Sequence, residues 1–376
     1  MSKSIIEFRK EFPYEKDRIH LNNAGIAPTM NSVRKKIDYC LELASQGYHQ
    51  IDRNLEVLEE SRASLGRFLN IPSGQLAFFP STSTAISQVA MGFPFNSGDE
   101  IITWDQEYSS NAYPWFAAQK KWGVRVKVIK SENNFNVKTE RLIEAMTNRT
   151  RMIAVSWVQW QTGSMTDLDL LSKECRVREI LLGVDAIQGL GVIPFDFQTS
   201  GVDIVFGGAH KWMCCPVGLG FMGIREDLIQ KLNPIYEGAF TYGAPGDPVD
   251  LDLLPKSTAH RFEPGAPPIL MAAALGESAE ILAKTGIKNV YKQAIAISDE
   301  IKKRVEKNNG IVFETRPVGA AGIRSPIITY QAAHGLDPER IRLTKNHISF
   351  NERVGGIRLS PHGFNQLSDV DRIFKD

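Results

Sequence analysis

The sequence predicts an α/β protein in which helices cover both faces of a mostly parallel sheet, followed by a smaller α+β domain. From about residue 54, strand-like and helical patterns alternate along the chain, as they do in α/β folds. The strand-like runs near residues 180 and 203 are apolar almost throughout, which is typical of strands buried on both faces. The alternation changes after a stretch rich in Gly and Pro at 237–255.

The elements of the first part follow from local patterns. Residues 54–69 have apolar side chains at helical spacing, which predicts an amphipathic helix. A short apolar run at 75–80 precedes a Ser/Thr cluster and a second helical stretch. Helix-like segments separate most of the later β-rich runs, which we expect at 100–104, 124–129, 152–157, 180–185 and 203–208.

The second part of the chain has a different order of elements. At 376 residues the chain exceeds the size at which one hydrophobic core stops growing, so we expect two domains. We place the large domain at 15–255 and the small one at 256–376, together with 1–14. For the small domain we expect a helical region at 268–308, strands near 311–314 and 323–329, and helices near 337–345 and 366–374.

The overall charge excludes some classes of partner. The chain has 44 Lys and Arg against 43 Asp and Glu, without a basic run, so we expect neither a nucleic-acid partner nor a membrane-surface partner. The first twenty residues are charged and lack the apolar segment of a secretory signal, and no stretch has the length and apolarity of a membrane span. We therefore expect a cytoplasmic protein. Its four cysteines lack metal-ligand spacing.

Polar residues follow two of the predicted central strands. Asp185 ends one apolar strand and Gln188 follows three residues later, while a second strand leads through small residues into His210 and Lys211. In open α/β sheets ligands bind at the carboxyl ends of the strands, so we expect these side chains to face one crevice.

This pattern has two interpretations. A lysine amine condenses with the aldehyde of pyridoxal 5′-phosphate (PLP), forming a Schiff base, and PLP enzymes place an acidic group at the pyridine nitrogen. Lys211 and Asp185 would fill these roles, with Gln188 donating to the phenolate oxygen of the ring. Alternatively, Asp185 is a helix cap and Lys211 a surface lysine whose amine reaches solvent. Spacing alone favours neither.

Several segments in order resemble the class V aminotransferase superfamily, which includes cysteine desulfurases, selenocysteine lyases and isopenicillin N epimerase-like proteins. The segments are LNNAGIAP (21–28), STSTAIS (81–87), EYSSNAYPW (107–115), DAIQ (185–188), HKW (210–212), GLGF (218–221), RFEPGAPP (261–268) and GGIRLSPHGFNQLSDVDR (355–372). The resemblance covers nearly the whole chain. It implies the aspartate aminotransferase-like fold (fold type I) with a seven-stranded sheet, PLP on Lys211, and a homodimer with active sites at the interface.

The resemblance also assigns roles around the cofactor. Thr82 and Ser83 are the expected phosphate ligands, because a helix N-terminus with hydroxyl groups suits an anion, and His210 resembles a family residue that reaches the same phosphate. Tyr108 stands where many relatives have a histidine stacked on the PLP ring. Tyrosine keeps the stacking role. A phenol, with an ordinary pKa of about 10, is a poorer proton carrier near neutral pH.

A second group of residues is expected to meet the substrate. Arg358 matches the family arginine that binds the substrate carboxylate, a task that suits its planar fork, and Asn23 is expected at the same end of the pocket. Arg353 and His362 lie in the same signature, where catalytic and structural roles stay open. One residue among Trp157, Gln159 and Trp160 is expected to shape the pocket.

Two departures from the family pattern bear on the reaction. Cysteine desulfurases have a nucleophilic cysteine in the loop before the C-terminal signature, and the corresponding span here, 344–356, has none. Ala266 replaces a threonine that in relatives reaches the phosphate of the neighbouring subunit. Cofactor binding should weaken but survive, because a hydrogen bond to a charged group contributes roughly 1.5–3 kcal/mol.

These residues predict an enzyme acting at Cα and Cβ of an amino acid, with Lys211 as the general base. We favour a lyase that removes the sulfur substituent of a cysteine-like substrate without a protein persulfide. An aminotransferase or an amino-acid epimerase is the alternative. A non-catalytic PLP-fold binding protein is a further one, although such a protein would be expected to have lost Lys211, Asp185 or Arg358.

Overall fold

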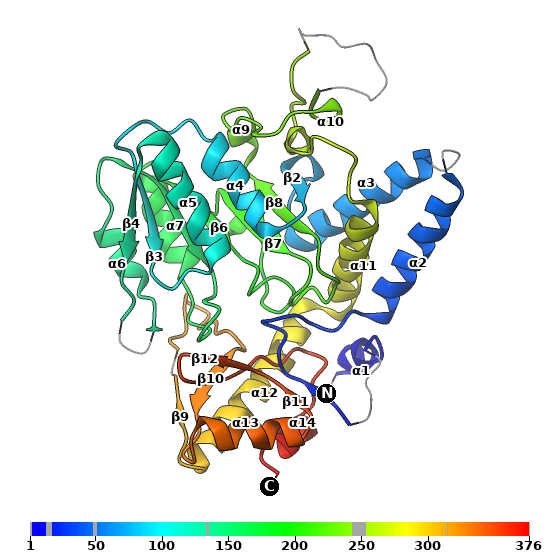
Figure 1. The fold of residues 1–376 in the computed structure, drawn as a ribbon, viewed down its shortest axis with the longest axis vertical. Coiled ribbons are helices and arrows are strands. Elements are labelled where there is room, and N and C mark those ends of the chain that lie inside the picture. Colours follow the sequence, from blue (N-terminus) through cyan, green and yellow to red (C-terminus); the bar gives the residue numbers. More distant parts are fainter. Residues whose placement is uncertain are drawn as a thin grey trace.

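The computed structural model has a large α/β unit and a small α+β unit, stacked along the long axis of the molecule (Figure 1). It describes residues 2–12, 17–47, 51–132, 135–242, 253–313 and 315–375. Part of the turn-rich stretch expected at 237–255 and the end of the strand expected at 311–314 lie outside these residues. Among the described helices, none combines the length and apolarity needed to cross a bilayer.

The large unit is built on a seven-stranded sheet in the order β2-β8-β7-β6-β5-β3-β4. Four strand pairs are parallel, and β8 is antiparallel to both of its neighbours. The expected seven-stranded, mostly parallel sheet is therefore confirmed. The strands are β2 (Leu76–Phe79), β3 (Glu100–Trp104), β4 (Arg125–Ile129), β5 (Thr150–Ser156), β6 (Leu181–Asp185), β7 (Ile204–Gly208) and β8 (Gly220–Ile224).

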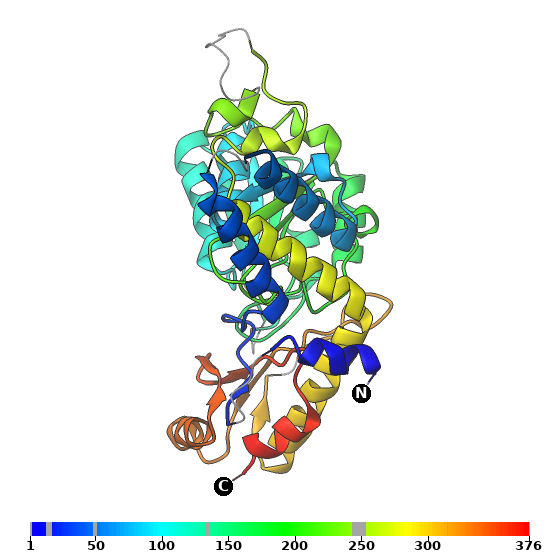
Figure 2. The ribbon, with the colours of Figure 1, turned by 90° about the vertical axis from the view of Figure 1, so that its right-hand side faces the viewer.

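Helices flank this sheet on both faces. Three of them, α2, α3 and α11, lie side by side on one face (Figure 2). The helices of the unit are α2 (Asn31–Ser45), α3 (Ile51–Leu69), α4 (Thr82–Gly92), α5 (Ser109–Trp122), α6 (Thr139–Glu144), α7 (Leu168–Val177), α8 (Phe197–Ser200), α9 (Glu226–Ile229), α10 (Ala239–Tyr242) and α11 (Ile269–Thr285), with short 3₁₀ turns at Ser73–Gln75 and Ala259–Phe262.

The small unit packs helices against a four-stranded antiparallel sheet in the order β12-β13-β10-β9. A parallel pair, β1 with β11, lies beside it. Its elements are α1 (Lys3–Arg9), β1 (Ile19–His20), α12 (Ile287–Lys307), β9 (Ile311–Val312), β10 (Ile328–Gln331), α13 (Leu336–Lys345), β11 (Ile348–Ser349), β12 (Asn351–Arg353), β13 (Gly356–Leu359) and α14 (Leu367–Ile373).

The packing favours a domain boundary later than the expected residue 256. The expected helical region at 268–308 is two helices, which meet at Gly286 with φ +82°. The first, α11, packs on α2 and α3, whereas α12 contributes to the core of the small unit. At the other end of the chain, Ile19 and Leu21 belong to that same small core although we placed them in the large domain. The packing therefore changes near Gly286, although Val290 and Ala294 at the start of α12 still belong to the larger core.

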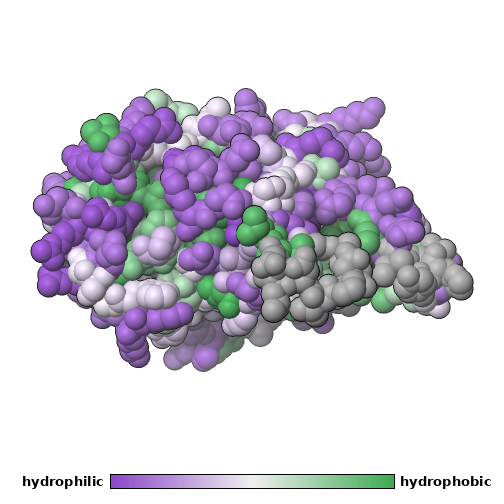
Figure 3. Space-filling model, turned by 90° about the horizontal axis from the view of Figure 1, so that it is seen from above, coloured by the Kyte–Doolittle hydropathy of each residue, from purple (hydrophilic) through white to green (hydrophobic). Residues whose placement is uncertain are grey.

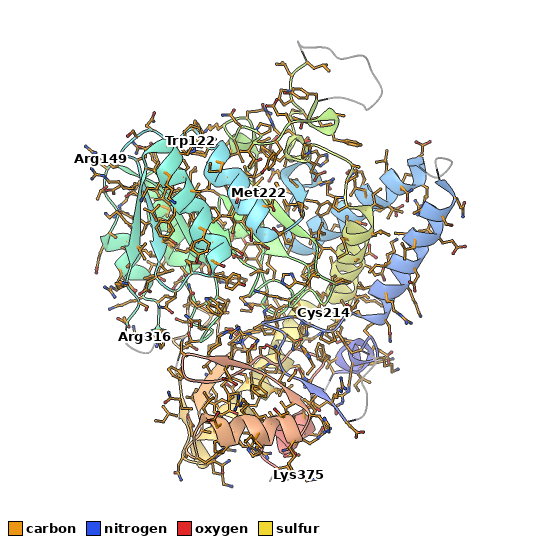
Figure 4. All side chains as sticks on the ribbon, viewed as in Figure 1. Trp122, Arg149, Cys214, Met222, Arg316 and Lys375 are labelled. Atoms are coloured by element: carbon orange, nitrogen blue, oxygen red, sulfur yellow. The ribbon has the colours of Figure 1, made fainter. Side chains whose placement is uncertain are left out.

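The end of the molecule farthest from the small unit has a mixed surface. Polar residues cover much of it, and hydrophobic atoms show in the gaps between them (Figure 3). The opposite side of the large unit faces the small unit, and Cys214 lies at that level (Figure 4). The carboxyl ends of β6 and β7 point to this junction, because they lead directly into residues that line a cavity there.

Candidate active site

A cavity of about 470 Å³ lies at the carboxyl ends of β6 and β7. Both units contribute to it, since its walls come from the two strand ends, the N-terminus of α4, the N-terminal loop and the β12–β13 hairpin. It is lined by Asn22, Ala24, Gly25, Ile26, Ser81, Thr82, Ser83, Tyr108, Ser110, Trp160, Asp185, Ile187, Gln188, His210, Lys211, Asn351, Arg353 and Arg358. All of the expected site residues except Asn23 are in this set.

Lys211 is half-buried in the turn that follows β7. Its Nζ has no hydrogen bond or ion pair with the residues that the structure describes, and it lies 5.5 Å from the centroid of the Tyr108 ring. Burial lowers the pKa of the amine to about 8, although Asp185 opposes this shift. A solvated surface lysine does not fit this position, because the side chain faces a cavity and is partly desolvated.

Asp185 is the last residue of β6 and is only 3% exposed. Its Oδ1 accepts a hydrogen bond of 3.0 Å from the backbone N–H of Ile187, so the residue does cap the turn that follows. Burial raises the pKa of its carboxyl, and the nearby Lys211 opposes that rise. The carboxyl is thus oriented by this hydrogen bond, and it lines the same cavity as the amine.

Gln188 joins three parts of the site. Its Nε2 donates to the carbonyl of Ala24 at 3.0 Å, and its Oε1 accepts from the indole Nε1 of Trp212 at 3.0 Å. One hydrogen of Nε2 is left for a ligand, because a side-chain amide has two.

The N-terminus of α4 forms part of the cavity wall. Ser81 is the N-cap, and its Oγ accepts from the backbone N–H of Thr84 at 3.1 Å. The hydroxyl of Thr82 donates to the carbonyl of Gly207 at 3.0 Å, and that of Ser83 donates to Ser110 at 2.7 Å. The Thr82 hydroxyl proton is therefore used within the protein, and the backbone N–H groups of the first turn are the donors that face an anion.

Gly208 lies where β7 approaches this turn closely. A Cβ on Gly208 would lie 2.7 Å from Ile187 Cδ1 and 2.9 Å from Thr82 Oγ1. The absence of a side chain therefore lets the end of β7 and the helix N-terminus come together, which keeps the anion-binding turn close to Lys211.

Arg358 lines the cavity from β13 and is 1% exposed. Its Nη1 donates to the carbonyl of Trp160, and its Nη2 donates to Asn22 Oδ1 at 3.2 Å. Burial lowers the pKa of the guanidinium to about 9. Since both acceptors are neutral and each Nη carries two hydrogens, the fork still has donors for a carboxylate.

The expectation for Asn23 needs a correction. Its side chain points away from the cavity, because its Nδ2 donates to the carbonyl of Ser360 at 2.8 Å in the interior. The preceding residue, Asn22, lines the cavity instead and accepts hydrogen bonds from Arg358 and Asn351. Asn22 pairs with Ser360 and Asn23 begins the turn that follows, and the sequence did not indicate which asparagine faces inward.

Glu107 is a half-buried residue to which the sequence assigned no role. Its carboxyl accepts hydrogen bonds from the backbone N–H and the hydroxyl of Ser156, and also from Asn111 and Gln159. Burial raises the pKa of this carboxyl to about 7. The contacts tie the start of α5 to the end of β5, and so fix Tyr108 at the cavity. The signal was its place in the EYSSNAYPW segment.

The structure distinguishes among the residues whose roles the sequence did not decide. Of Trp157, Gln159 and Trp160, only Trp160 lines the cavity. Arg353 also lines it, with its guanidinium 4.8 Å from the centroid of the Trp160 ring. His362 is fully buried, and its Nε2 donates to the carbonyl of Trp212 at 3.0 Å because its Nδ1 accepts from the N–H of Gly363. His362 therefore supports the Lys211 turn from behind.

The donor set fits PLP. A half-buried amine lies beside a carboxylate, an amide with a free hydrogen and a helix N-terminus with free N–H groups. These are the partners that an aldehyde, a pyridine nitrogen, a phenolate oxygen and a phosphate require. The fold and this site together define a PLP-dependent enzyme of fold type I.

Comparisons with known proteins agree with this class. The model of the family "Aminotransferase class-V" matches residues 19–372. A probable cysteine desulfurase of Methanothermobacter thermautotrophicus is 27% identical over 387 residues, covering 98% of this chain and 96% of the relative. An uncharacterized aminotransferase of Schizosaccharomyces pombe is 23% identical, covering 98% of this chain and 94% of the relative. The chain belongs to the class V aminotransferase family.

Solved structures show the same fold. An apo cysteine desulfurase from Thermococcus onnurineus NA1 superposes with a TM-score of 0.87 at 21% identity, covering 97% of this chain and 95% of that one. The cystine C–S lyase C-DES, in complex with its product cysteine persulfide, has a TM-score of 0.83 at 19% identity, covering 95% and 96%. The expectations of a class V family member, a fold type I architecture and a PLP-dependent enzyme are confirmed. The roles of the individual site residues stay predictions.

Proposed function

We propose that this chain is a lyase that cleaves the C–S bond of a cysteine-like amino acid by β-elimination, without a persulfide on a protein cysteine. The overall reaction converts the substrate and water into a thiol, pyruvate and ammonia. Membership of the class V family and the desulfurase-like relatives support an amino-acid substrate. The observation that carries the proposal is the position of the thiols.

No thiol is available at the cavity. All four cysteines are buried, and none of them lines its walls. Cys214 and Cys215 follow Lys211 closely in sequence, but their side chains point into the protein, where Sγ of Cys215 contacts the carbonyls of Met213 and Ala274. Burial raises the pKa of the Cys215 thiol to about 12. A protonated, enclosed thiol is a poor nucleophile, so sulfur must leave with the substrate's own substituent.

Each end of the cavity has a separate task. Lys211 would hold the aldehyde of PLP, Asp185 its pyridine nitrogen and Gln188 its phenolate oxygen, with Tyr108 over the ring. The N–H groups of Thr82 and Ser83, together with His210, would hold the phosphate. When bound, PLP supplies an electron sink for the negative charge that develops at Cα.

The remaining residues position the substrate and move protons. Arg358 binds the α-carboxylate through the donors that its neutral partners leave free. Lys211, with a pKa near 8, accepts the Cα proton at neutral pH once its amine is released. Asp185 stays next to it as the only carboxylate among the described residues that line the cavity, and so limits how far the amine pKa falls.

The test is product formation by a cysteine-free enzyme. A variant with all four cysteines replaced by alanine, incubated with PLP and S-substituted cysteines, should release pyruvate and thiol at rates near those of the natural sequence. If the cysteine-free variant is unstable, the natural enzyme can be alkylated with N-ethylmaleimide instead. Its activity should remain intact. Strong inhibition by alkylation, or sulfur recovered as a protein persulfide, would refute the proposal.

The same assay separates the alternatives. An aminotransferase would leave the amino group on the cofactor and release a keto acid that keeps its β-substituent. Exchange of the Cα hydrogen for deuterium with no pyruvate indicates an epimerase. A protein that PLP does not colour is a binding protein.

The homodimer expected from the family is part of this proposal. Ala266 is exposed on the surface of the single chain, away from the cavity, as expected of a residue that meets a neighbouring subunit. Sedimentation equilibrium should give twice the chain mass of 42.0 kDa, and a monomer would refute it.

A further inference from the structure

The β12–β13 hairpin presents two arginines to the cavity from one face. In its register Asn351 lies opposite Arg358 and Arg353 lies opposite Gly356. Residues that are paired, or two apart along a strand, share a face of the sheet. Asn351, Arg353 and Arg358 therefore point to the same side, and all three line the cavity.

The turn of this hairpin fixes that register. Val354 and Gly355 both have positive φ, +47° and +74°, as a two-residue hairpin turn requires. Gly356 is opposite Arg353, and a Cβ there would lie 2.3 Å from the carbonyl of Tyr330. The guanidinium of Arg353 lies 4.8 Å from the centroid of the Trp160 ring.

Neither guanidinium has a carboxylate partner among the described residues. Arg358 donates only to the Trp160 carbonyl and the Asn22 side chain. Arg353 donates from Nη1 to the backbone carbonyl of Glu352 at 2.6 Å. The Glu352 carboxylate belongs to the other face of the hairpin and lies 3.9 Å from Arg340. In both cavity arginines the Nε is buried and has no acceptor.

Arg353 and Arg358 share a cavity and form no ion pair with the described residues, so their charges disfavour each other. Burial lowers the pKa of Arg358, and the charge of Arg353 lowers it further. An amino acid with a single α-carboxylate neutralises one guanidinium. The cofactor phosphate does not serve the other, because its expected site is the helix N-terminus at Ser81–Ser83, on a different element of the cavity wall from the β12–β13 hairpin.

We propose that Arg353 binds a second anionic group, a carboxylate or sulfonate, on the side chain of the substrate. The substrate class is then an S-substituted cysteine whose substituent ends in an acid. The proposal rests on the proposed function only in that the substrate is a cysteine derivative. Planar recognition of carboxylates and stacking on an aromatic face are the properties in which arginine differs from lysine.

The experiment compares two substrates of equal shape and different charge. S-carboxymethyl-L-cysteine and S-carbamoylmethyl-L-cysteine differ only in a terminal acid or amide. Elimination from the acid gives pyruvate, ammonia and thioglycolate, with one water consumed. We expect kcat/KM to favour the acid by at least about tenfold, the size of one charge-assisted pair. In Arg353→Gln the ratio of the two kcat/KM values should fall to near one.

Two further variants control for charge and folding. Arg353→Lys keeps the charge but not the fork, and should restore only part of the preference. Arg340→Gln removes an exposed arginine of the same region, outside the cavity, and should keep the full ratio. Thermal unfolding and the visible absorbance of bound PLP should match across all variants.

A binding measurement separates this inference from the proposed function. Analogues of the two substrates that lack the α-amino group are not turned over. Calorimetry with the PLP-loaded protein gives the Kd value of each analogue. If the diacid binds more tightly than its monoamide, and Arg353→Gln loses this difference, the role of Arg353 is supported. This holds even if no pyruvate forms, and in that case only the lyase proposal fails. Equal Kd values and equal kcat/KM values for acid and amide overturn the inference and leave the lyase intact.

Discussion

The indole Nε1 of Trp212 donates a hydrogen bond of 3.0 Å to Oε1 of Gln188, which joins the turn after β7 to the turn after β6. Nε2 of Gln188 continues the chain to the carbonyl of Ala24 in the N-terminal loop. On the other side, His362 donates to the carbonyl of Trp212. The residue after Lys211 is thus bonded to two segments that are far apart in sequence and, through Gln188, linked to a third, and this holds the lysine at the cavity.

Replacing Trp212 with phenylalanine should destabilise the protein, because Gln188 Oε1 would be left buried without a donor. An unsatisfied buried acceptor costs about 1–3 kcal/mol. Urea denaturation measures the loss. Trp104→Phe is the matched control, since that indole is also buried but its Nε1 has no partner among the described residues. Equal losses in the two variants would mean that the hydrogen bond contributes nothing.

Cofactor uptake should depend on pH through Lys211. Only the neutral amine attacks an aldehyde, and burial lowers the pKa of this amine to about 8. The rate at which the apo protein gains the visible absorbance of bound PLP should rise about tenfold per pH unit below 8 and level off above it. A midpoint near 10, as for an ordinary lysine, would contradict the desolvated position. Lys211→Ala should show no such band at any pH.

Gly208→Ala should weaken PLP binding. The new methyl group would be forced against Ile187 and the Thr82 hydroxyl at the end of β7, which moves the anion-binding turn away from Lys211. Gly183→Ala on the neighbouring strand is the control, since a Cβ there has its nearest neighbour at an ordinary 3.7 Å. Titration with PLP should give a Kd at least about tenfold higher for the first variant only. Similar Kd values would show that the turn tolerates the shift.

Arg358→Ala should lose substrate affinity and keep the cofactor. Charge-assisted hydrogen bonds contribute roughly 1.5–3 kcal/mol each, so kcat/KM should fall by about two orders of magnitude or more. The PLP spectrum should stay unchanged because Arg358 is on β13 and has no expected contact with the cofactor. Arg340→Ala, at an exposed position, should retain activity. Activity at the natural level in Arg358→Ala would refute the carboxylate role.

Stability should fall as the pH drops from about 6.5 to 4. Burial lowers the pKa of His362 to about 4, below its value of about 6.5 in the unfolded chain. The unfolded state therefore binds more protons in this window, and folding loses roughly 2–3 kcal/mol from this residue across it. His20 and His210, whose pKa values burial also lowers to about 4, add to the effect.

Urea denaturation at several pH values measures this slope. His362→Asn should flatten it, whereas His347→Asn, at an exposed position, should leave it unchanged. Identical slopes in the natural sequence and His362→Asn would contradict the assignment.

Local patterns predicted the parallel strands well. The apolar runs expected at 180–185 and 203–208 are β6 and β7 within a residue, since strands buried on both faces are apolar throughout. The antiparallel β8 was not assigned, because Gly220 and Gly223 weaken its strand pattern. Those glycines serve close packing, and Gly220 lets β8 approach the Ser81–Thr82 backbone.

The sequence by itself determined the class of chemistry. A lysine after one buried strand, an aspartate after another and an ordered series of family segments indicated PLP, and these are features of local pattern and order. The tertiary structure decided which neighbours complete the site: Asn22 rather than Asn23, Glu107 behind Tyr108, and Arg353 beside Arg358. These depend on which way a side chain points and which distant segment it meets, and strand register and packing between the two units set both.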